Sequence, residues 1–300
     1  MSTASTRASL KASELNNAWV ADVGGTSIRI AVVSPSGDIL AELTYPTSEF
    51  SEPTLAWAMM MDSWQSLDPG RTPAGIAISL PARVKNSGVI DYIPNIPTWT
   101  GSNPVSTFAS ATGTPAHALF DIHAALRGER WKGEDVPPTF YFFAIGTGIG
   151  GAFQVDGHLA CGAHNIAGMP AIPLPGFTQE NGWVETVASG PAVALACGAQ
   201  SGQEALARAL SGDNDSLKAF EKAALALQKI ISIVTVVVDA SEVRVGGGFG
   251  IAAFDLLFPH RHLTDEYRTY PPVHNDVIIR PASTGSQAQV LGLAATVFGK

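Results

Sequence analysis

The chain has 300 residues, of which 46% are hydrophobic and 15% charged, and its formal net charge is −8. That is enough apolar material for a large core and for two domains. The 18 Lys and Arg form no basic cluster, which argues against a nucleic-acid partner, and no apolar run approaches the ~20 residues of a membrane span. Cys161 and Cys197 are too few for a disulfide framework, which predicts a cytoplasmic protein.

Residues 1–17 are polar and lack the apolar stretch of a secretory signal, so we predict a disordered lead-in. The next 110 residues alternate between strand and helix patterns. Predicted strands cover 19–23, 28–33, 39–44, 75–80, 88–93 and 116–120, and predicted helices cover 52–67 and 122–129. Two prolines fix a loop at 94–99, and Asp121 is placed to cap the second helix.

The second half repeats the alternation. Predicted strands cover 139–145, 152–155, 234–239, 243–245 and 277–280, and predicted helices cover the end of 181–196, then 201–212, 216–233, 251–258 and 287–298. Proline and glycine make 157–175 irregular. Such alternation predicts layered α/β domains.

The same glycine hairpin occurs twice. One turn is Gly24-Gly25-Thr26 and the other is Gly146-Thr147-Gly148, each between two apolar strands. Glycine lets backbone N–H groups approach an anion, and the threonines add hydroxyl donors. Asp22 suits a phosphate that arrives with Mg²⁺. Neither turn is a Walker A loop, since no Gly-Lys-Ser/Thr follows, and neither leads into a helix as a Rossmann turn does.

The order of these motifs resembles that of the ROK family of sugar kinases, a glucokinase-like group that also contains repressors. The motifs are the two hairpins, the glycine-rich stretch 157–168, the loop 94–99, Asp121 with its helix, the run 185–190 and Gly246-Gly247-Gly248. Each is weak alone, but their shared order covers nearly the whole chain after residue 17.

The resemblance implies a two-domain α/β, hexokinase/actin-like (RNase H-like) fold with an interdomain cleft. We expect a small domain of 18–120 plus 285–300 and a large domain of 121–284. The hairpins, through Gly24, Gly25, Thr26, Gly146, Thr147 and Gly148, would hold the phosphates of ATP, and Gly246, Gly247 and Gly248 would hold its adenosine. Asp22 would orient Mg²⁺ directly or through water, and the sugar would lie between Asn95 and Asp121.

The resemblance makes Asp121 the general base of a phosphoryl transfer to a sugar hydroxyl, the 6-hydroxyl by analogy with the family. An alcohol is a poor nucleophile, and a carboxylate that accepts its proton removes that obstacle. Taken alone, an Asp before a helix is usually a cap, and Asp121 could serve as both.

The departures from the family pattern are concentrated on the sugar side. Phe120 replaces the usual Asn, and Met169 and Ile172 stand where the sugar-contacting Glu and His are expected. The family's zinc loop corresponds to 174–184, which has no cysteine, so we predict no structural zinc.

The remaining sugar shell would be Asn95, Asp121 and Glu185. Its two carboxylates favour an amino-hexose with an ammonium group, while compensation by His123 or Gln179 would leave an ordinary hexose equally suitable. ATP and polyphosphate both stay open as donors, although few basic residues are available for polyphosphate.

The alternative function is a catalytically degenerate, sugar-binding or regulatory ROK protein. A regulatory member of the family would carry a helix-turn-helix segment of roughly 60–80 residues before the first hairpin. Only about 20 residues precede Asp22, which argues against a DNA-binding regulator. The apolar terminal helices are compatible with a homodimer.

Overall fold

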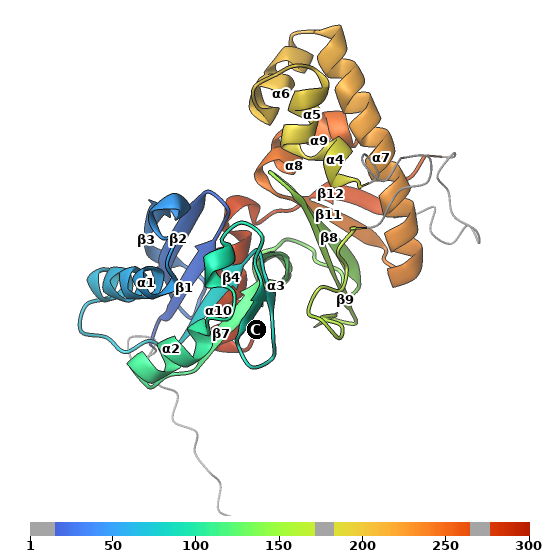
Figure 1. Cartoon of the computed structure of the whole chain (residues 1–300). Coiled ribbons are helices and arrows are strands. Elements are labelled where there is room, and N and C mark those ends of the chain that lie inside the picture. The colour runs from blue at the N-terminus through green and yellow to red at the C-terminus, as the bar shows by residue number, and fades with distance from the viewer. Residues whose placement is uncertain (1–15, 172–182, 265–276) are drawn as a thin grey trace, which may run out of the picture. The chain divides into compact units, whose positions relative to one another are not determined.

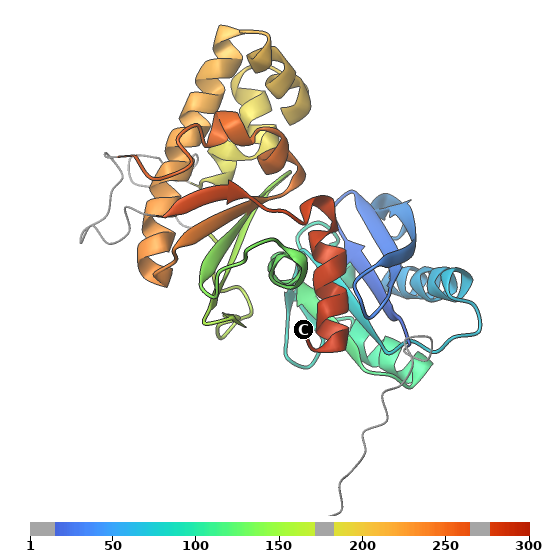
Figure 2. The same cartoon turned by 180° about the vertical axis from the view of Figure 1, so that it is seen from behind.

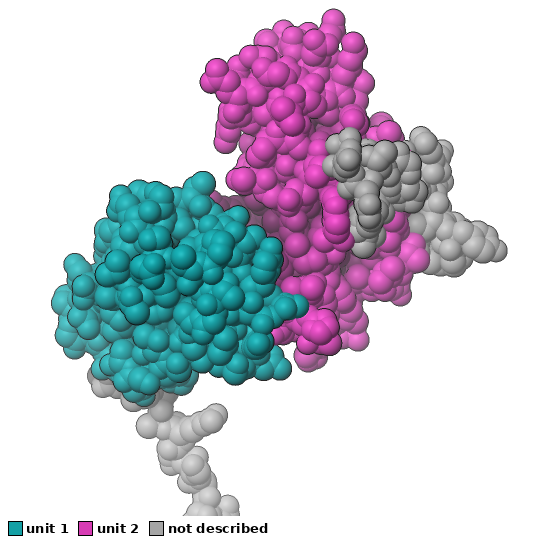
Figure 3. Space-filling model, viewed as in Figure 1, with its two compact units in different colours: residues 1–119, 293–300 teal, residues 120–292 magenta. Residues whose placement is uncertain are grey.

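The structure is a computed structural model, which describes residues 16–171, 183–264 and 277–300. The chain forms two compact units, one ending at Leu119 and completed by Leu293–Lys300, the other covering Phe120–Gly292 (Figure 3). The expected boundaries were 120/121 and 284/285. Of the expected lead-in 1–17, only its last two residues are described. Asn17 is buried rather than disordered, because its Nδ2 donates to Asp68 Oδ2 at 3.2 Å.

The first unit is a mixed sheet with helices packed on it (Figure 1). Its strand order is β3-β2-β1-β4-β7, in which β1 pairs antiparallel with β2 and parallel with β4. The bounds are β1 Ala18–Val23, β2 Ser27–Val33, β3 Ile39–Pro46, β4 Gly75–Leu80, β7 Ala116–Phe120, α1 Pro53–Leu67 and α2 Pro104–Thr112. The predicted meander and first helix are confirmed.

An aromatic cluster forms the core of this unit. Trp64 stacks on Trp19 at 6.0 Å, and Trp57 meets Trp99 edge-on at 4.7 Å between ring centroids. Phe108 of α2 joins the same cluster. Helix α2 was not predicted from the sequence, although its start carried a signal: Asn103 caps the helix by accepting from Ser106 N, and Pro104 follows at the first position.

The second unit is a sheet covered on both faces. Its strand order is β10-β9-β8-β11-β12, with β11 parallel to both neighbours. The strands are β8 Phe140–Ile145, β9 Ile149–Val155, β10 His158–Leu159, β11 Glu242–Gly246 and β12 Ile278–Pro281.

Short β5 (Arg83–Val84) and β6 (Ile90–Tyr92) belong to the first unit and pair only with each other.

Alternate residues of β8 face two separate cores. Phe140 and Phe142 pack with α3 (Asp121–Lys132). Tyr141 and Phe143 pack with the other helices of the unit, as period-two alternation requires. Those helices are α4 Glu185–Ala188, α5 Gly190–Ala196, α6 Gly202–Leu210, α7 Asn214–Val238, α8 Gly248–Ala252 and α9 Phe254–Leu257.

The predicted strand at 234–239 is wrong, because α7 continues through it to Val238. Its β-branched run favours a strand by local preference. Helical spacing, however, buries Ile231, Thr235 and Val238 on one side, while Val237 is 78% exposed. Burial of that side against the core outweighs the local preference, and the Thr235 hydroxyl donates back to Ile231 O at 2.7 Å.

The terminal helix α10 (Ala288–Phe298) lies beside α3, as the reverse view shows (Figure 2). Its apolar residues Val290 and Leu293 are buried within the chain, and the homodimer stays a prediction. None of the helices in the described ranges is long and apolar enough to cross a membrane.

The two helices approach so closely that only glycine fits where they cross. A Cβ on Gly128 would meet the Ala288 carbonyl oxygen, and one on Gly292 would meet the Ala124 carbonyl oxygen, both well inside contact distance. The contact is therefore backbone to backbone, with Gly292 N at 3.0 Å from the position a Gly128 Cβ would take. An added methyl group forces the helices apart.

We therefore expect Gly128→Ala to lower the free energy of unfolding by about 3 kcal/mol, the upper part of the range for an overpacked interior. Gly248→Ala is the matched control, since a Cβ there meets nothing within 4 Å. Urea unfolding of both variants measures the difference. Equal stabilities would contradict the close crossing.

Candidate functional site

The first glycine hairpin ties down its carbonyl groups and leaves its amides at the surface. Gly24 N donates to Ser27 O at 2.8 Å, Thr47 Oγ1 donates to Gly24 O at 2.9 Å, and Thr47 N donates to Thr26 O at 3.0 Å. In the described part of the chain, nothing accepts from the amides of Gly25 and Thr26, and both residues are exposed. Such a turn presents N–H groups to an anion.

Asp22 lies at the end of β1, next to Ser79 on the parallel strand β4. Ser79 Oγ donates to Asp22 Oδ1 at 2.6 Å. Burial raises the pKa of the Asp22 carboxyl, and the Ser79 hydrogen bond and the positive charge of Arg29 partly oppose that rise. No hydrogen bond from the described residues reaches Oδ2. A cation bound beside this carboxylate would stabilise its ionised form.

Asn95 lies against the same hairpin. The position of a Cβ on Gly25 would be 3.0 Å from Asn95 Nδ2, so the turn and this side chain are in direct contact. The loop is fixed by the short 3₁₀ turn Pro97–Trp99, whose Trp99 is buried and donates from Nε1 to Phe50 O at 3.2 Å. The first unit thus brings together a predicted phosphate-binding turn and a predicted sugar-binding residue.

The second hairpin is supported from below by Glu185. Glu185 Oε2 accepts from Ile149 N at 2.8 Å and would lie 2.8 Å from a Cβ on Gly148. Gly190 N donates to Gly146 O at 2.9 Å. Thr147 is exposed at the tip. The carboxylate predicted to bind sugar is therefore also the group that shapes this turn.

The third glycine loop packs on the strand that feeds the second hairpin. Gly246 ends β11 opposite Ala144, and a Cβ on it would lie 2.5 Å from the Phe142 ring. Gly247 has φ +79° and sits against the backbone of Ile145, a conformation and approach that favour glycine. The second unit therefore gathers Thr147, Glu185 and Gly246–Gly248 around the end of β8.

Asp121 is the first residue of α3, and Phe120 occupies the cap position expected for it. Its Oδ1 accepts from Ile122 N at 2.7 Å, and the side chain is partly exposed. The carboxylate is thus held at the N-terminus of α3 by the adjacent backbone N–H.

His123 lies beneath the surface, with 3% of its area exposed. Burial lowers the pKa of His123 to about 4, against the raising effect of its hydrogen bond to the Ala167 backbone. Its ring is 5.7 Å from that of Phe120, and its Nε2 has no partner in the described ranges. At neutral pH it is an uncharged residue that supports the loop ending at Met169.

Tyr141 anchors the same loop from the sheet. Its hydroxyl donates to Gly168 O, and burial raises its pKa. A Cβ on Gly151 would lie 2.6 Å from the Tyr141 ring carbon that carries the hydroxyl. The loop before Met169 is therefore fixed by two buried side chains.

Ser79 and Thr47 were not predicted as site residues from the sequence. Ser79 was included in an apolar strand as structure alone, although a hydroxyl beside the register position of Asp22 was a usable signal. Thr47 gave no signal, because it belongs to no motif and reaches the carbonyls of Gly24 and Thr26 only in the folded chain. Ile172, Gln179 and most of 174–184 lie outside the described residues. No cluster of His, Cys, Asp and Glu suited to a metal occurs in the described ranges, and the absence of structural zinc stays a prediction.

The two α/β units with their paired glycine hairpins define a hexokinase/actin-like fold. The model of the ROK family matches residues 20–299, and the chain belongs to that family. An N-acetylmannosamine kinase of Citrobacter koseri is 26% identical, over 93% of this chain and 97% of the relative. A glucokinase of Halalkalibacterium halodurans is 24% identical, over 90% and 92%.

The fold is also that of a ROK family glucokinase from Streptomyces griseus, solved in complex with glucose and AMPPNP. The TM-score is 0.75 at 19% identity, and the match covers 93% of this chain and 98% of that one.

The low pKa of His123 predicts a pH-dependent stability. The folded state binds this proton only below about pH 4, whereas the unfolded chain binds it below an ordinary value of 6.5. The free energy of unfolding therefore rises with pH between these values, by about 3 kcal/mol at 1.36 kcal/mol per unit. The contribution is complete above pH 6.5 and is lost as the pH falls towards 4.

The measurement is urea unfolding of wild type and His123→Asn at several values between pH 4 and 7. Asparagine keeps a donor for Ala167 but does not titrate. We expect the stability difference between the two proteins to change by about 3 kcal/mol across this range. Parallel curves would exclude a buried neutral His123.

Proposed function

We propose that this chain is an ATP-dependent sugar kinase that transfers a phosphoryl group to a hydroxyl of a hexose or amino-hexose, the 6-hydroxyl by analogy with its family. The observation that carries the proposal is the first hairpin, with its carbonyls bound by Thr47, its amides at the surface and Asp22 beside it. A pure sugar binder has no use for such a turn. The names of the kinase relatives support the same reading.

The residues fit Mg²⁺ with ATP. Asp22 supplies a hard oxygen ligand, with Ser79 fixing one oxygen and the other left without a hydrogen bond in the described residues. Bound Mg²⁺ would offset the negative charge of the phosphates. Asp22 would hold it directly or through water. At the first hairpin Gly25 and Thr26 would bind phosphate oxygens, and at the second Thr147 and Gly148 would do so, whereas the amides of Gly24 and Gly146 are already bonded within their own turns to Ser27 O and Gly148 O.

The remaining roles belong to the sugar and the adenosine. Gly246, Gly247 and Gly248 would leave room for the adenosine, Asn95 and Glu185 would bind sugar hydroxyls, and Asp121 would accept the proton of the attacking hydroxyl. His123 supports the loop and would act on the sugar only through Ala167, because the side chain is buried.

The substrate class follows from what the sugar shell lacks. With Met169 in place of a hydrogen-bonding side chain, each lost contact weakens binding of an ordinary glucose by roughly 0.5–1.5 kcal/mol. A sugar whose C1–C3 region carries a different substituent loses less. The relatives leave both substrates open, since one is named N-acetylmannosamine kinase and another, of similar identity, is named glucokinase.

The first experiment is an ADP-release assay over a sugar panel with ATP and, separately, polyphosphate. The panel holds glucose, mannose, fructose, glucosamine, 3-amino-3-deoxyglucose, N-acetylglucosamine and N-acetylmannosamine. Because ADP release reports ATP alone, sugar phosphate is measured directly in the polyphosphate arm. Glucose with the highest kcat/KM and inert amino sugars would contradict the amino-sugar substrate.

Asp121→Asn tests the base. We expect kcat to fall by about 10²–10⁴-fold, because the proton of the hydroxyl loses its acceptor, while sugar and AMPPNP still bind. Asp215→Asn, at an exposed position of α7, is the matched control and should keep the wild-type rate. Unchanged turnover in Asp121→Asn would remove Asp121 from the mechanism.

Ser79→Ala tests the Mg²⁺ role of Asp22. Loss of the Ser79 hydrogen bond leaves burial less opposed, so the pKa of Asp22 rises further. The acidic limb of the activity profile should move to higher pH, and the Mg²⁺ concentration for half-maximal rate should rise about fivefold, as for one hydrogen bond. Ser63→Ala, which removes a hydrogen bond to Tyr45 in the same unit, should change neither.

The competing function is a degenerate sugar-binding or regulatory protein. It predicts sugar binding with no sugar-dependent phosphoryl transfer from either donor. Calorimetric titration with the same sugar panel separates it from an inactive preparation.

A further inference from the structure

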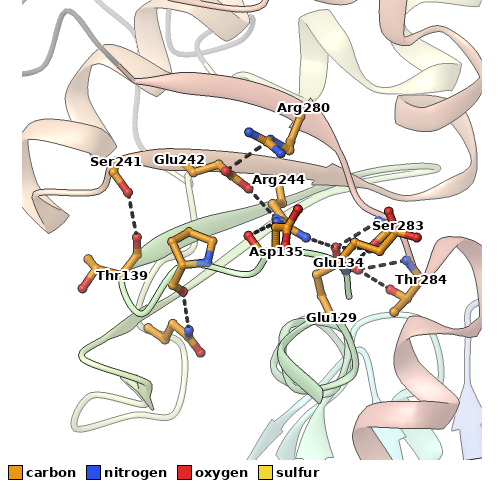
Figure 4. A network of polar contacts seen from close by, with 12 residues as sticks. Glu129, Glu134, Asp135, Thr139, Ser241, Glu242, Arg244, Arg280, Ser283 and Thr284 are labelled. Carbon is orange, nitrogen blue, oxygen red and sulfur yellow. Dashed lines mark hydrogen bonds and ion pairs between the residues drawn. The ribbon is translucent and has the colours of Figure 1, made fainter. Parts of the chain in front are cut away.

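Glu129 is the most heavily hydrogen-bonded carboxylate among the described residues, and no step of the proposed mechanism uses it (Figure 4). Oε1 accepts from Arg244 Nη1 at 2.7 Å and from Ser283 N and Oγ, both at 2.9 Å. Oε2 accepts from Thr284 N at 3.0 Å and Thr284 Oγ1 at 2.5 Å. The side chain is fully buried.

Arg244 is equally enclosed and extends the network. Its Nε donates to Glu242 Oε1 at 2.5 Å and its Nη2 to Asp135 O at 2.8 Å, and Arg280 Nε lies 3.2 Å from Glu242 Oε2. The two acids and two arginines balance in charge. Burial raises the pKa of Glu129, but the Thr284, Ser283 and Arg244 hydrogen bonds outweigh it and hold that pKa below its ordinary value.

Glu129 and its partners come from three elements. Glu129 is on α3, eight residues after Asp121, or about 12 Å along the helix axis. Arg244 is on β11, two residues before Gly246. Ser283 and Thr284 precede α10, whose Gly292 touches the backbone of α3. One carboxylate thus joins the helix of Asp121, the strand of the third glycine loop and the segment that enters α10.

We infer that Glu129 is a positioning residue, which fixes α3 along and about its axis and so sets the Asp121 carboxylate relative to the Gly246–Gly248 loop. The inference rests on the proposed role of Asp121 as the base. Charge-assisted hydrogen bonds are directional, and five on one carboxylate leave α3 no freedom to slide or rotate. An apolar contact of the same size would stabilise the helix without fixing its register.

Glu129→Gln is the sharpest variant because it keeps the length of the side chain. Every position around the carboxylate is filled by a donor, so the new NH₂ group must face either Thr284 or Arg244 and Ser283. Donor facing donor pushes α3 away. Because a displacement of about 1 Å at reacting groups costs about 100-fold in rate, we expect kcat to fall about 10- to 100-fold.

The experiment combines kinetics, binding and hydrogen exchange on the full chain. For Glu129→Gln we expect the dissociation constants of AMPPNP and sugar to stay within about threefold. The displaced base lowers kcat, whereas the groups that bind the two substrates stay in place. Amide exchange should accelerate in the first turns of α3 and in residues 283–292. Gln228→Leu breaks the buried hydrogen bonds of Gln228 to the His262 carbonyl and the Thr264 amide in the same unit. It should lower Tm without lowering kcat.

Ser283→Ala and Thr284→Ala cover the case in which Glu129→Gln fails to fold. Each removes one hydroxyl donor and keeps the backbone N–H bond, so kcat should fall in smaller steps. A wild-type kcat in the folded variants would overturn the inference. Turnover that slows only in proportion to a lowered Tm, with the Gln228→Leu control slowed to the same extent, would also overturn it.

The outcomes separate the two proposals. If wild type transfers no phosphoryl group to any sugar, or Asp121→Asn keeps its rate, the proposed function fails and the positioning of a base falls with it. If wild type is active, Asp121→Asn is not, and Glu129→Gln is as active as wild type, only the positioning role fails.

Discussion

The buried ion pair between Glu129 and Arg244 is the interaction on which the second unit depends. Taken as a contribution to stability, a buried pair is weak evidence, since removing two charges from water costs about as much as their attraction returns. Its value here lies in geometry. Oε1 of Glu129 accepts from both β11 and the segment before α10, and Oε2 accepts from that segment alone, so the sheet, α3 and the chain entering α10 can meet in one arrangement only. The close backbone contact at the glycines of α3 and α10 further restricts how these two helices can shift against each other.

The two hairpins illustrate how one local sequence pattern receives two different supports. In the first, Thr47 occupies the turn carbonyls through its hydroxyl and amide. In the second, the Gly190 amide donates to the Gly146 carbonyl, and the Glu185 carboxylate accepts from the Ile149 amide at the other end of the turn. Both supports leave the tip of the turn exposed. The common requirement is a turn whose amides are rigidly presented, because an anion gains most from donors that need not reorganise when it binds.

Local pattern was enough to predict most strands, most helices and both hairpins, because each is bounded by turn residues and carries its own periodicity. It failed at 234–239, where a β-branched run is the buried end of a helix, since the sequence of that run contains no information about the sheet it packs on. It also missed Ser79 and the partners of Glu129. Arg244 is 115 residues from Glu129, and no spacing rule relates them.

The proposed sugar shell can change while the fold persists. The loop before Met169 is held by Tyr141 and by the uncharged His123, both acting on backbone atoms. Backbone support does not depend on which side chain occupies position 169, so a polar residue there can be replaced without loss of the loop. The proposed nucleotide side has no such freedom, because Gly25, Gly246 and Gly247 each lie where a Cβ would meet a neighbour. On the proposed roles, substrate choice can therefore diverge on the sugar side while the glycine turns stay constrained.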